Sequence, residues 1–148
     1  MTFVALGGAG EIGMNMYLYG YGPVGKQKFI LVDCGVTFPD MDSTPGVDLI
    51  MADPSFIAER ADRLEAVLIT HAHEDHIGAI GQLLPQLQAP VGARRFTAAI
   101  ARSKLERVGL NPDAVEEVGA WPETRQFGPF NIGFLPVSHS IPEASALV

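Results

Sequence analysis

Residues 70–76 read Thr70-His71-Ala72-His73-Glu74-Asp75-His76, and they directly follow the apolar run Ala66-Val67-Leu68-Ile69. The apolar run predicts a buried strand. Imidazole nitrogens and carboxylate oxygens are ligands for first-row metals, and this short stretch holds three of the four histidines of the chain. Where a strand gives way to a helix, the backbone turns successive side chains toward one point, which a straight strand does not do. The stretch therefore predicts a metal site at the end of a strand.

A second histidine-bearing stretch, Ser138-His139-Ser140-Ile141-Pro142-Glu143, follows the predicted strand 130–137. Taken alone, His139 is more often a hydrogen-bonded structural residue than a ligand, and Asp75 alone would be a helix cap. Because all four histidines lie just beyond strand ends, both stretches can reach one edge of a sheet, and the ligand role is favoured. The predicted metal ligands are His71, His73, Asp75, His76 and His139.

Size and composition predict one globular domain, since 148 residues with 47% hydrophobic and 18% charged residues can bury a real core. No stretch approaches the roughly 20 apolar residues of a membrane span, and the N-terminus lacks a basic leader region. We therefore expect a soluble, cytoplasmic protein that does not bind membranes. The single cysteine, Cys34, cannot form an internal disulfide and is expected to be a buried, small hydrophobic residue.

The net charge of −7 argues against a surface that binds nucleic acid through clustered cations. Bound divalent metals would make the potential at the site more positive than the total suggests. The one basic neighbourhood is expected to be a solvated helix face, because no aromatic residues are interleaved for base stacking. It comprises Arg94, Arg95, Arg102, Lys104 and Arg107.

The glycines Gly8, Gly10 and Gly13 match the dinucleotide-binding pattern G-x-G-x-x-G, and Asp33 follows them about 20 positions later. A dinucleotide site needs a helix after the glycines, whereas residues 14–25 are rich in aromatics and then in turn-forming glycine and proline. We therefore expect strand, turn, strand, and a structural or substrate-facing glycine loop. Asp33 has two open roles, a turn-forming carboxylate or a hydrogen-bonding partner behind the metal loop.

The remaining pattern predicts alternating strands and helices. A helix is expected from the N-cap Asp53 to about Ala61, and another beyond His76 through Leu87. Further expected elements are strands 2–6, 29–32, near Val91, 116–118, 130–137 and 145–148, a loop from residue 33 through 46, a helix 97–108, and a turn at Gly128-Pro129 between the strands 116–118 and 130–137.

The pattern H-x-H-x-D-H of His71, His73, Asp75 and His76 resembles the signature of the metallo-β-lactamase superfamily, which includes β-lactamases, thiolester hydrolases such as glyoxalase II, and nucleases. The stretches 7–15, 31–40 and 138–143 are similar to the ribonuclease J family, in its β-CASP group. The resemblance implies an α/β fold, the first half of an αββα sandwich, with a mixed β-sheet and outer helices. Residues 1–148 would be the N-terminal portion of a metallo-β-lactamase domain, with no second domain in this chain.

The same resemblance implies that His71, His73 and His139 hold one zinc ion and that Asp75 and His76, as catalytic residues, hold a second. Mn²⁺ is an alternative metal. Two metals sharing a hydroxide would lower the pKa of water to about 7 and clamp a phosphodiester for in-line attack. The family's bridging aspartate and last histidine have no counterpart in these residues, so we expect this chain alone to bind the second metal weakly and to have little nuclease activity.

The implied function is exonucleolytic and endonucleolytic hydrolysis of RNA, by a protein that is homo-oligomeric at full length. One alternative keeps the metal site but acts on esters, thiolesters or lactams. Another is a non-catalytic metal-binding or assembly module. A departure from the family is Gly92, where we expect a bulkier aromatic residue, and this affects the expected local packing.

Overall fold

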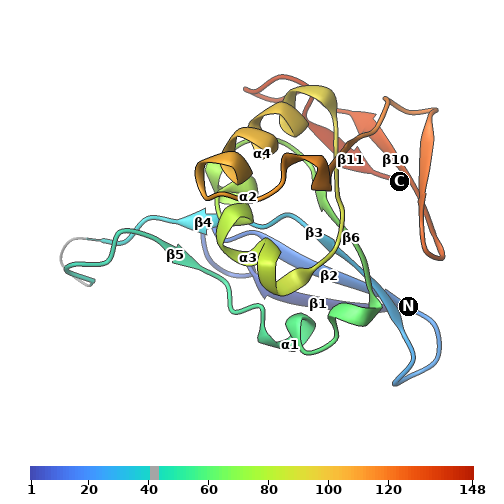
Figure 1. The fold of residues 1–148 in the computed structure, drawn as a ribbon, viewed down its shortest axis with the longest axis horizontal. Coiled ribbons are helices and arrows are strands. Elements are labelled where there is room, and N and C mark those ends of the chain that lie inside the picture. Colours follow the sequence, from blue (N-terminus) through green and yellow to red (C-terminus); the bar gives the residue numbers. More distant parts are fainter. Residues whose placement is uncertain (41–43) are drawn as a thin grey trace.

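The computed structural model describes residues 1–40 and 44–148 and is built around a mixed, six-stranded sheet (Figure 1). In spatial order, the strands are β1 (Thr2–Gly7), β2 (Met16–Tyr21), β3 (Lys28–Val32), β6 (Leu64–Ile69), β7 (Val91–Ala93) and β8 (Val115–Glu117). The first three strands pair antiparallel, and loops at residues 8–15 and 22–27 connect them. From β3 to β8 the pairs are parallel, and helical crossovers connect them. The predicted mixed sheet is confirmed.

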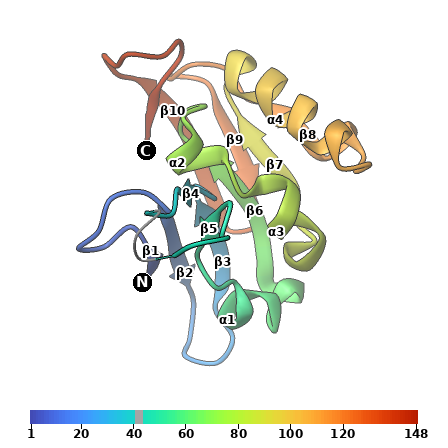
Figure 2. The same cartoon turned by 90° about the vertical axis from the view of Figure 1, so that its left-hand side faces the viewer.

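The four α-helices cover one face of this sheet in the described part of the chain (Figure 2). They are α1 (Ser55–Ala58), α2 (Glu74–Ile77), α3 (Ile80–Leu87) and α4 (Arg95–Arg107), with single 3₁₀ turns at Ala61–Arg63 and Pro112–Ala114. The helix predicted at 97–108 is confirmed with slightly earlier ends. The helix predicted from Asp53 to Ala61 is shorter, since it begins at Ser55 and gives way to the 3₁₀ turn. Among the described residues, no helix has the length and apolar character needed to cross a membrane.

The helix predicted beyond His76 is confirmed from Ile80 to Leu87 as α3, but Ile77 belongs to the separate helix α2, because the helix is interrupted between α2 and α3. In a continuous helix the amide of Ala79 would donate to the carbonyl of Asp75. Here Ala79 N donates to Cys34 O at 2.9 Å, and Asp75 O accepts instead from the backbone amide of Asn15 at 3.0 Å. These two long-range bonds hold α2 against the ends of β2 and β3, beside the predicted metal stretch.

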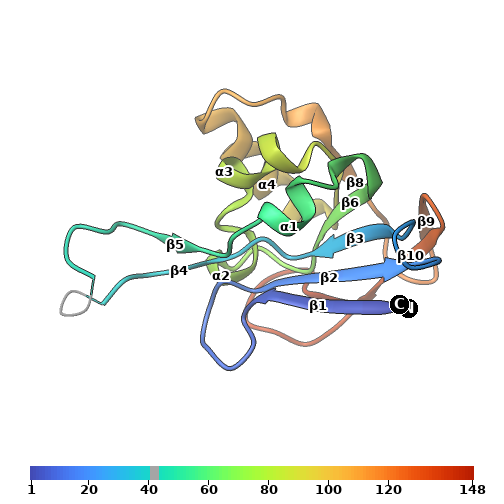
Figure 3. The same cartoon turned by 90° about the horizontal axis from the view of Figure 1, so that it is seen from below.

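Two small sheets were not fully predicted. Within the predicted loop 33–46 and just after it, β4 (Val36–Thr37) and β5 (Ile50–Met51) pair as an antiparallel ribbon that projects from the body of the domain (Figure 3). Residues 41–43 of that predicted loop lie outside the described residues. The other sheet contains β9 (Thr124–Phe127), β10 (Phe130–Pro136) and β11 (Ser145–Leu147). The Gly128-Pro129 turn therefore joins β10 to the unpredicted β9, not to β8.

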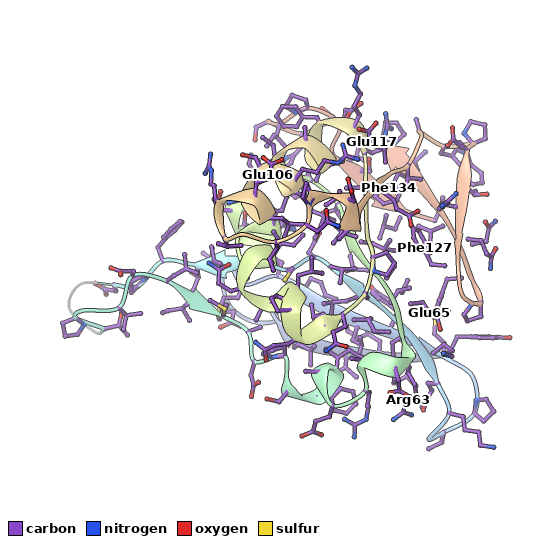
Figure 4. The ribbon with its side chains drawn as sticks, in the orientation of Figure 1. Arg63, Glu65, Glu106, Glu117, Phe127 and Phe134 are labelled. Carbon is purple, nitrogen blue, oxygen red and sulfur yellow. The ribbon has the colours of Figure 1, made fainter. Side chains whose placement is uncertain are left out.

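The central sheet has a hydrophobic core on each face. Val67 and Ile69 of β6 pack with the helices, whereas Ala66 and Leu68 pack with Phe127 and Phe134 of the small sheet, which Figure 4 labels. This two-sided burial explains the continuous apolar run at residues 66–69 of β6. The unexpected Gly92 belongs to the second core: a Cβ atom there would lie 2.9 Å from Phe127 Cζ and 3.0 Å from Leu68 Cδ2. The aromatic side chain expected at position 92 therefore has no room, because Phe127 fills that space.

Candidate metal centre

Three histidines meet beyond the carboxyl end of β6. His71 and His73 follow that strand directly, and His139 comes from the loop between β10 and β11. One ring nitrogen of each lies within 4.8 Å of the others, and the ring centroids are 4.7 to 4.9 Å apart. Thus the structure brings together residues 68 positions apart that the sequence predicted to share a site. We call His71, His73 and His139 the histidine triad.

His71 is the buried member of the histidine triad, with 7% of its surface exposed. Its Nδ1 lies 2.9 Å from Thr70 Oγ1, whereas its Nε2 is buried and has no hydrogen-bond partner among the described residues. Leaving a buried polar atom unpaired costs about 1 to 3 kcal/mol. Burial and the neighbouring histidines lower the pKa of His71 to about 4, so the ring is neutral at pH 7 and keeps a lone pair for a ligand.

Hydrogen bonds and an ion pair hold the C-terminal end of the loop that carries His139. Glu143 Oε1 accepts from Arg94 Nη2 at 3.1 Å, and Oε2 accepts from the backbone amide of Phe96 at 2.6 Å, in the first turn of α4. Ser145 N then donates to Thr70 O at 3.1 Å, next to His71. These contacts hold the loop between α4 and the end of β6, which places His139 over the other two triad histidines.

Asp75 and His76 form a second group beside the histidine triad. His76 Nε2 lies 3.3 Å from Asp75 Oδ2, and the ring centroids of His76 and His71 are 4.0 Å apart. The Asp75 side chain is 44% exposed and that of His76 is 21% exposed, so solvent reaches this pair more easily than it reaches His71. All five predicted ligands therefore lie in one neighbourhood, divided into a triad and a pair.

Asp33 combines the two roles that the sequence left open. It follows β3 with a positive φ of 64°, and its carboxylate accepts from Thr70 N at 2.8 Å and Thr70 Oγ1 at 2.9 Å. Its Oδ2 lies 2.7 Å from His76 Nδ1. Burial raises the pKa of Asp33, although these hydrogen bonds oppose the rise. Burial also opposes protonation of His76, but the bond to Asp33 and the charges of Asp33 and Asp75 outweigh it and raise the pKa of His76.

Sequence reasoning missed Asn15 as a site residue and identified it only as the end of a stretch similar to a family. The side-chain amide of Asn15 lies within 3.2 Å of both Asp75 Oδ2 and His76 Nε2. The glycine loop before it leads into β2, not into a helix, and β3 follows, so the predicted strand, turn, strand is confirmed. No spacing rule links residue 15 to residue 75, and the only local signal was the polar residue after the glycines.

The basic neighbourhood on α4 is largely paired with carboxylates. Arg94 pairs with Glu143, Arg102 with Glu117 at 2.7 Å, and Lys104 with Glu74 at 2.7 Å. Three of its five cations are thus already engaged. This agrees with the interpretation as an ordinary helix face, which was favoured over a nucleic-acid surface.

Comparison with known proteins places this geometry in a family. The chain is 46% identical to Ribonuclease J of Sinorhizobium meliloti over 148 residues and 44% identical to Ribonuclease J of Mycolicibacterium smegmatis over 148 residues. These alignments cover 100% and 99% of this chain but 26% and 25% of the relatives, so the chain spans about a quarter of the length of the curated relatives it matches.

Solved structures support the same fold. The metallo-beta-lactamase fold protein YhfI from Bacillus subtilis superimposes with a TM-score of 0.53 at 21% identity, over 98% of this chain and 54% of that protein. The model of the Metallo-beta-lactamase superfamily matches residues 10–145, a range that holds the whole histidine triad and the Asp75–His76 pair. The sheet, the helices and this match together show that the chain belongs to the metallo-beta-lactamase superfamily.

Proposed function

We propose that this chain forms the N-terminal portion of a metallo-β-lactamase domain in a metal-dependent hydrolase that cleaves RNA phosphodiester bonds. The observation that carries the metal centre is the buried, unpartnered Nε2 of His71 within the histidine triad. A buried acceptor that faces two further imidazoles is satisfied by a cation more readily than by a neutral donor. The donor set therefore fits a transition metal.

The proposed metal ligands form the same two groups as in the structure, the histidine triad and the Asp75–His76 pair. The histidine triad would hold one zinc ion, and Asp75 with His76 would contribute to a second. Zinc is proposed because imidazole and carboxylate are its common ligands, and Mn²⁺ would accept the same atoms. When bound, such ions supply Lewis acidity that lowers the pKa of water to about 7 and neutralises phosphate charge.

Neighbouring side chains orient the imidazole rings of His71 and His76 for metal binding. Thr70 Oγ1 lies against His71 Nδ1, which leaves Nε2 as the ring nitrogen without a partner among the described residues. Asp33 lies against His76 Nδ1, and a proton held between those two atoms leaves His76 Nε2 with its lone pair toward Asp75. Each ring is thus oriented by a partner on its far nitrogen, which is how proteins fix the tautomer of a metal-binding histidine.

RNA is the proposed substrate because the curated relatives at 44 to 46% identity are named Ribonuclease J and align over nearly the whole chain. With RNA as substrate, we place the protein in the cytoplasm. The full-length protein is proposed to be homo-oligomeric and to cleave RNA both exonucleolytically and endonucleolytically. The net charge of −7 and the paired cations of α4 mean that RNA contacts would come from the metals and from surfaces beyond the basic neighbourhood.

The test uses the complete gene product loaded with zinc or manganese. It is offered labelled single-stranded RNA and, in parallel, a thiolester and a β-lactam. We expect metal-dependent cleavage of RNA, abolished by chelation and restored by metal, and no turnover of the small esters. Hydrolysis of a thiolester or lactam with intact RNA would overturn the substrate assignment. Metal binding without any hydrolysis would instead favour a non-catalytic module.

A further inference from the structure

The glycine loop between β1 and β2 is the one sequence motif that the proposed function does not yet use. Gly8, Gly10 and Gly13 have φ values of 80°, 79° and 88°, and Met14 follows with 51°. Positive φ values are costly for residues with a Cβ atom, so the glycines permit a path that other residues would not readily follow. The glycine loop places Asn15 beside the Asp75–His76 pair.

Asn15 joins three separate segments through its backbone. Its amide donates to Asp75 O at 3.0 Å, and its carbonyl accepts from Gly35 N at 3.0 Å. A Cβ atom at Gly35 would collide with the carbonyl of Asp75, so glycine at that position permits this close approach. Asn15 is therefore held rigidly against the first turn of α2, where Asp75 and His76 lie.

The side-chain amide of Asn15 has one possible orientation. Nδ2 lies 3.1 Å from Asp75 O and 3.2 Å from Asp75 Oδ2, and both of these oxygens can only accept. On the other side, the hydroxyl of Tyr17 donates to Asn15 Oδ1 at 2.9 Å. A Cβ atom at Gly8 would lie 2.6 Å from both Asn15 Oδ1 and Tyr17 Oη, so the glycine makes room for this bond.

The same amide nitrogen lies 3.2 Å from His76 Nε2. With the single ring proton of a neutral His76 on Nδ1, against Asp33, the lone pairs of Asp75 Oδ2 and His76 Nε2 lie 3.3 Å apart and repel each other unless a donor or a cation lies close to both. In this structure the N–H groups of Asn15 provide that donor. They hold the two atoms 3.3 Å apart, where both would be available to one ion.

We propose that Asn15 is a positioning residue for the second metal ion, oriented by Tyr17 and delivered by the glycine loop. It keeps Asp75 Oδ2 and His76 Nε2 together before the ion arrives and keeps its bond to Asp75 O afterwards. This inference rests on the metal centre of the proposed function, but not on the substrate. Its effect is confined to the Asp75–His76 pair, because Asn15 makes no described contact with the histidine triad.

The test is a titration of the metal-free, complete gene product with Co²⁺, whose visible absorption reports each ion as it binds. Wild type is expected to bind two classes of ion. Asn15→Ala should weaken the second class about 10-fold or more and leave the first within about twofold, as losses of partners behind metal ligands do. Tyr17→Phe, which removes only a hydroxyl, should weaken the second class in the same direction by a smaller factor. Asn131→Ala, at an exposed position of β10, is the matched control and should change neither class.

Second-class binding by both Asn15→Ala and Tyr17→Phe equal to that of wild type would overturn the proposal. Equal weakening of both classes would overturn it as well, since that pattern indicates a general loss of structure. If Asn15→Ala does not fold, Tyr17→Phe decides by the same criterion. Failure of wild type to bind any Co²⁺ would contradict the metal centre of the proposed function, and uncut RNA with the expected binding pattern would contradict only the substrate.

Discussion

The histidine triad and the Asp75–His76 pair lie side by side but are built differently. The triad joins two distant stretches, and its buried member, His71, has an Nε2 with no partner among the described residues. The pair lies within one turn of α2. Its ligand atoms, Asp75 Oδ2 and His76 Nε2, lie against the side-chain amide of Asn15, and Asp33 lies against the other ring nitrogen of His76. The histidine triad thus contains a buried nitrogen without a hydrogen-bond partner among the described residues, whereas Asp75 Oδ2 and the ring nitrogens of His76 have partners.

The chain thus offers two neighbouring metal positions whose ligand atoms are fixed in different ways. An unpartnered, buried nitrogen favours any cation that reaches it, so the triad should bind first and tightly. The pair is solvent-accessible and offers two ligand atoms, so its affinity depends on how well the surrounding bonds fix those atoms. Mutations behind the pair should therefore affect the second ion selectively, and mutations behind the His139 loop should affect the first.

The largest effect is expected for Gly35→Ala, because a Cβ atom there collides with the carbonyl of Asp75. Overpacking against a fixed backbone should lower the free energy of unfolding by about 3 kcal/mol and displace α2. Urea denaturation and Co²⁺ titration measure the two consequences. Gly109→Ala, just after α4, is the control: Gly109 has a positive φ but open space around it, so a loss of only about 1 kcal/mol and no change in metal binding are expected. Equal losses in the two variants would show that the close approach is unimportant.

Asp33→Asn should have the next largest effect and should act mainly on the pair. The substitution removes the charge that orients His76 Nδ1 while keeping an oxygen for Thr70. We expect about 2 kcal/mol lower stability and about 10-fold weaker binding of the second ion. Asp113→Asn, at an exposed carboxylate, serves as control. An unchanged second affinity would mean that Asp33 is needed only for the turn.

Glu143→Gln tests the triad side of the comparison. The variant keeps an acceptor for the amide of Phe96 but loses the ion pair with Arg94, so the His139 loop should loosen. The first ion should bind up to about 10-fold more weakly, with the second little affected, in the same titration. Glu117→Gln removes an exposed ion pair with Arg102 near the same helix and should change neither affinity. A selective loss of the second ion would contradict the division proposed here.

The smallest effect concerns Cys34, which bonds through its backbone to the pair's segment but contributes no ligand. Burial, with the charge of Asp33, raises the pKa of the Cys34 thiol from 9.0 to about 12. Iodoacetamide at pH 8 should therefore modify it only after unfolding, with or without metal. Because the unfolded chain loses this proton first, the free energy of unfolding should fall between about pH 9 and 12. Rapid labelling of the folded protein would show that the thiol is accessible and reactive.

Much of the fold and of the candidate site followed from local patterns. The apolar run before Thr70 and the helical spacing after Arg94 gave the central strand and α4 because both faces of β6 and one face of α4 are buried. Strand β9 was missed since only Phe127 of its four residues is buried, so it carries no alternating pattern. Asn15 was missed for another reason: its partners are 60 positions away, and hydrogen bonds over such a separation leave no periodic trace.

Elemental analysis of the purified complete gene product, with and without His71→Ala, directly measures whether the histidine triad holds a metal ion. If the buried Nε2 of His71 is a metal ligand, wild type should retain a transition metal through dialysis, and the variant should lose the ion of the histidine triad. Wild type without metal, or a variant with the same metal content as wild type at equal folded fraction, would contradict the account.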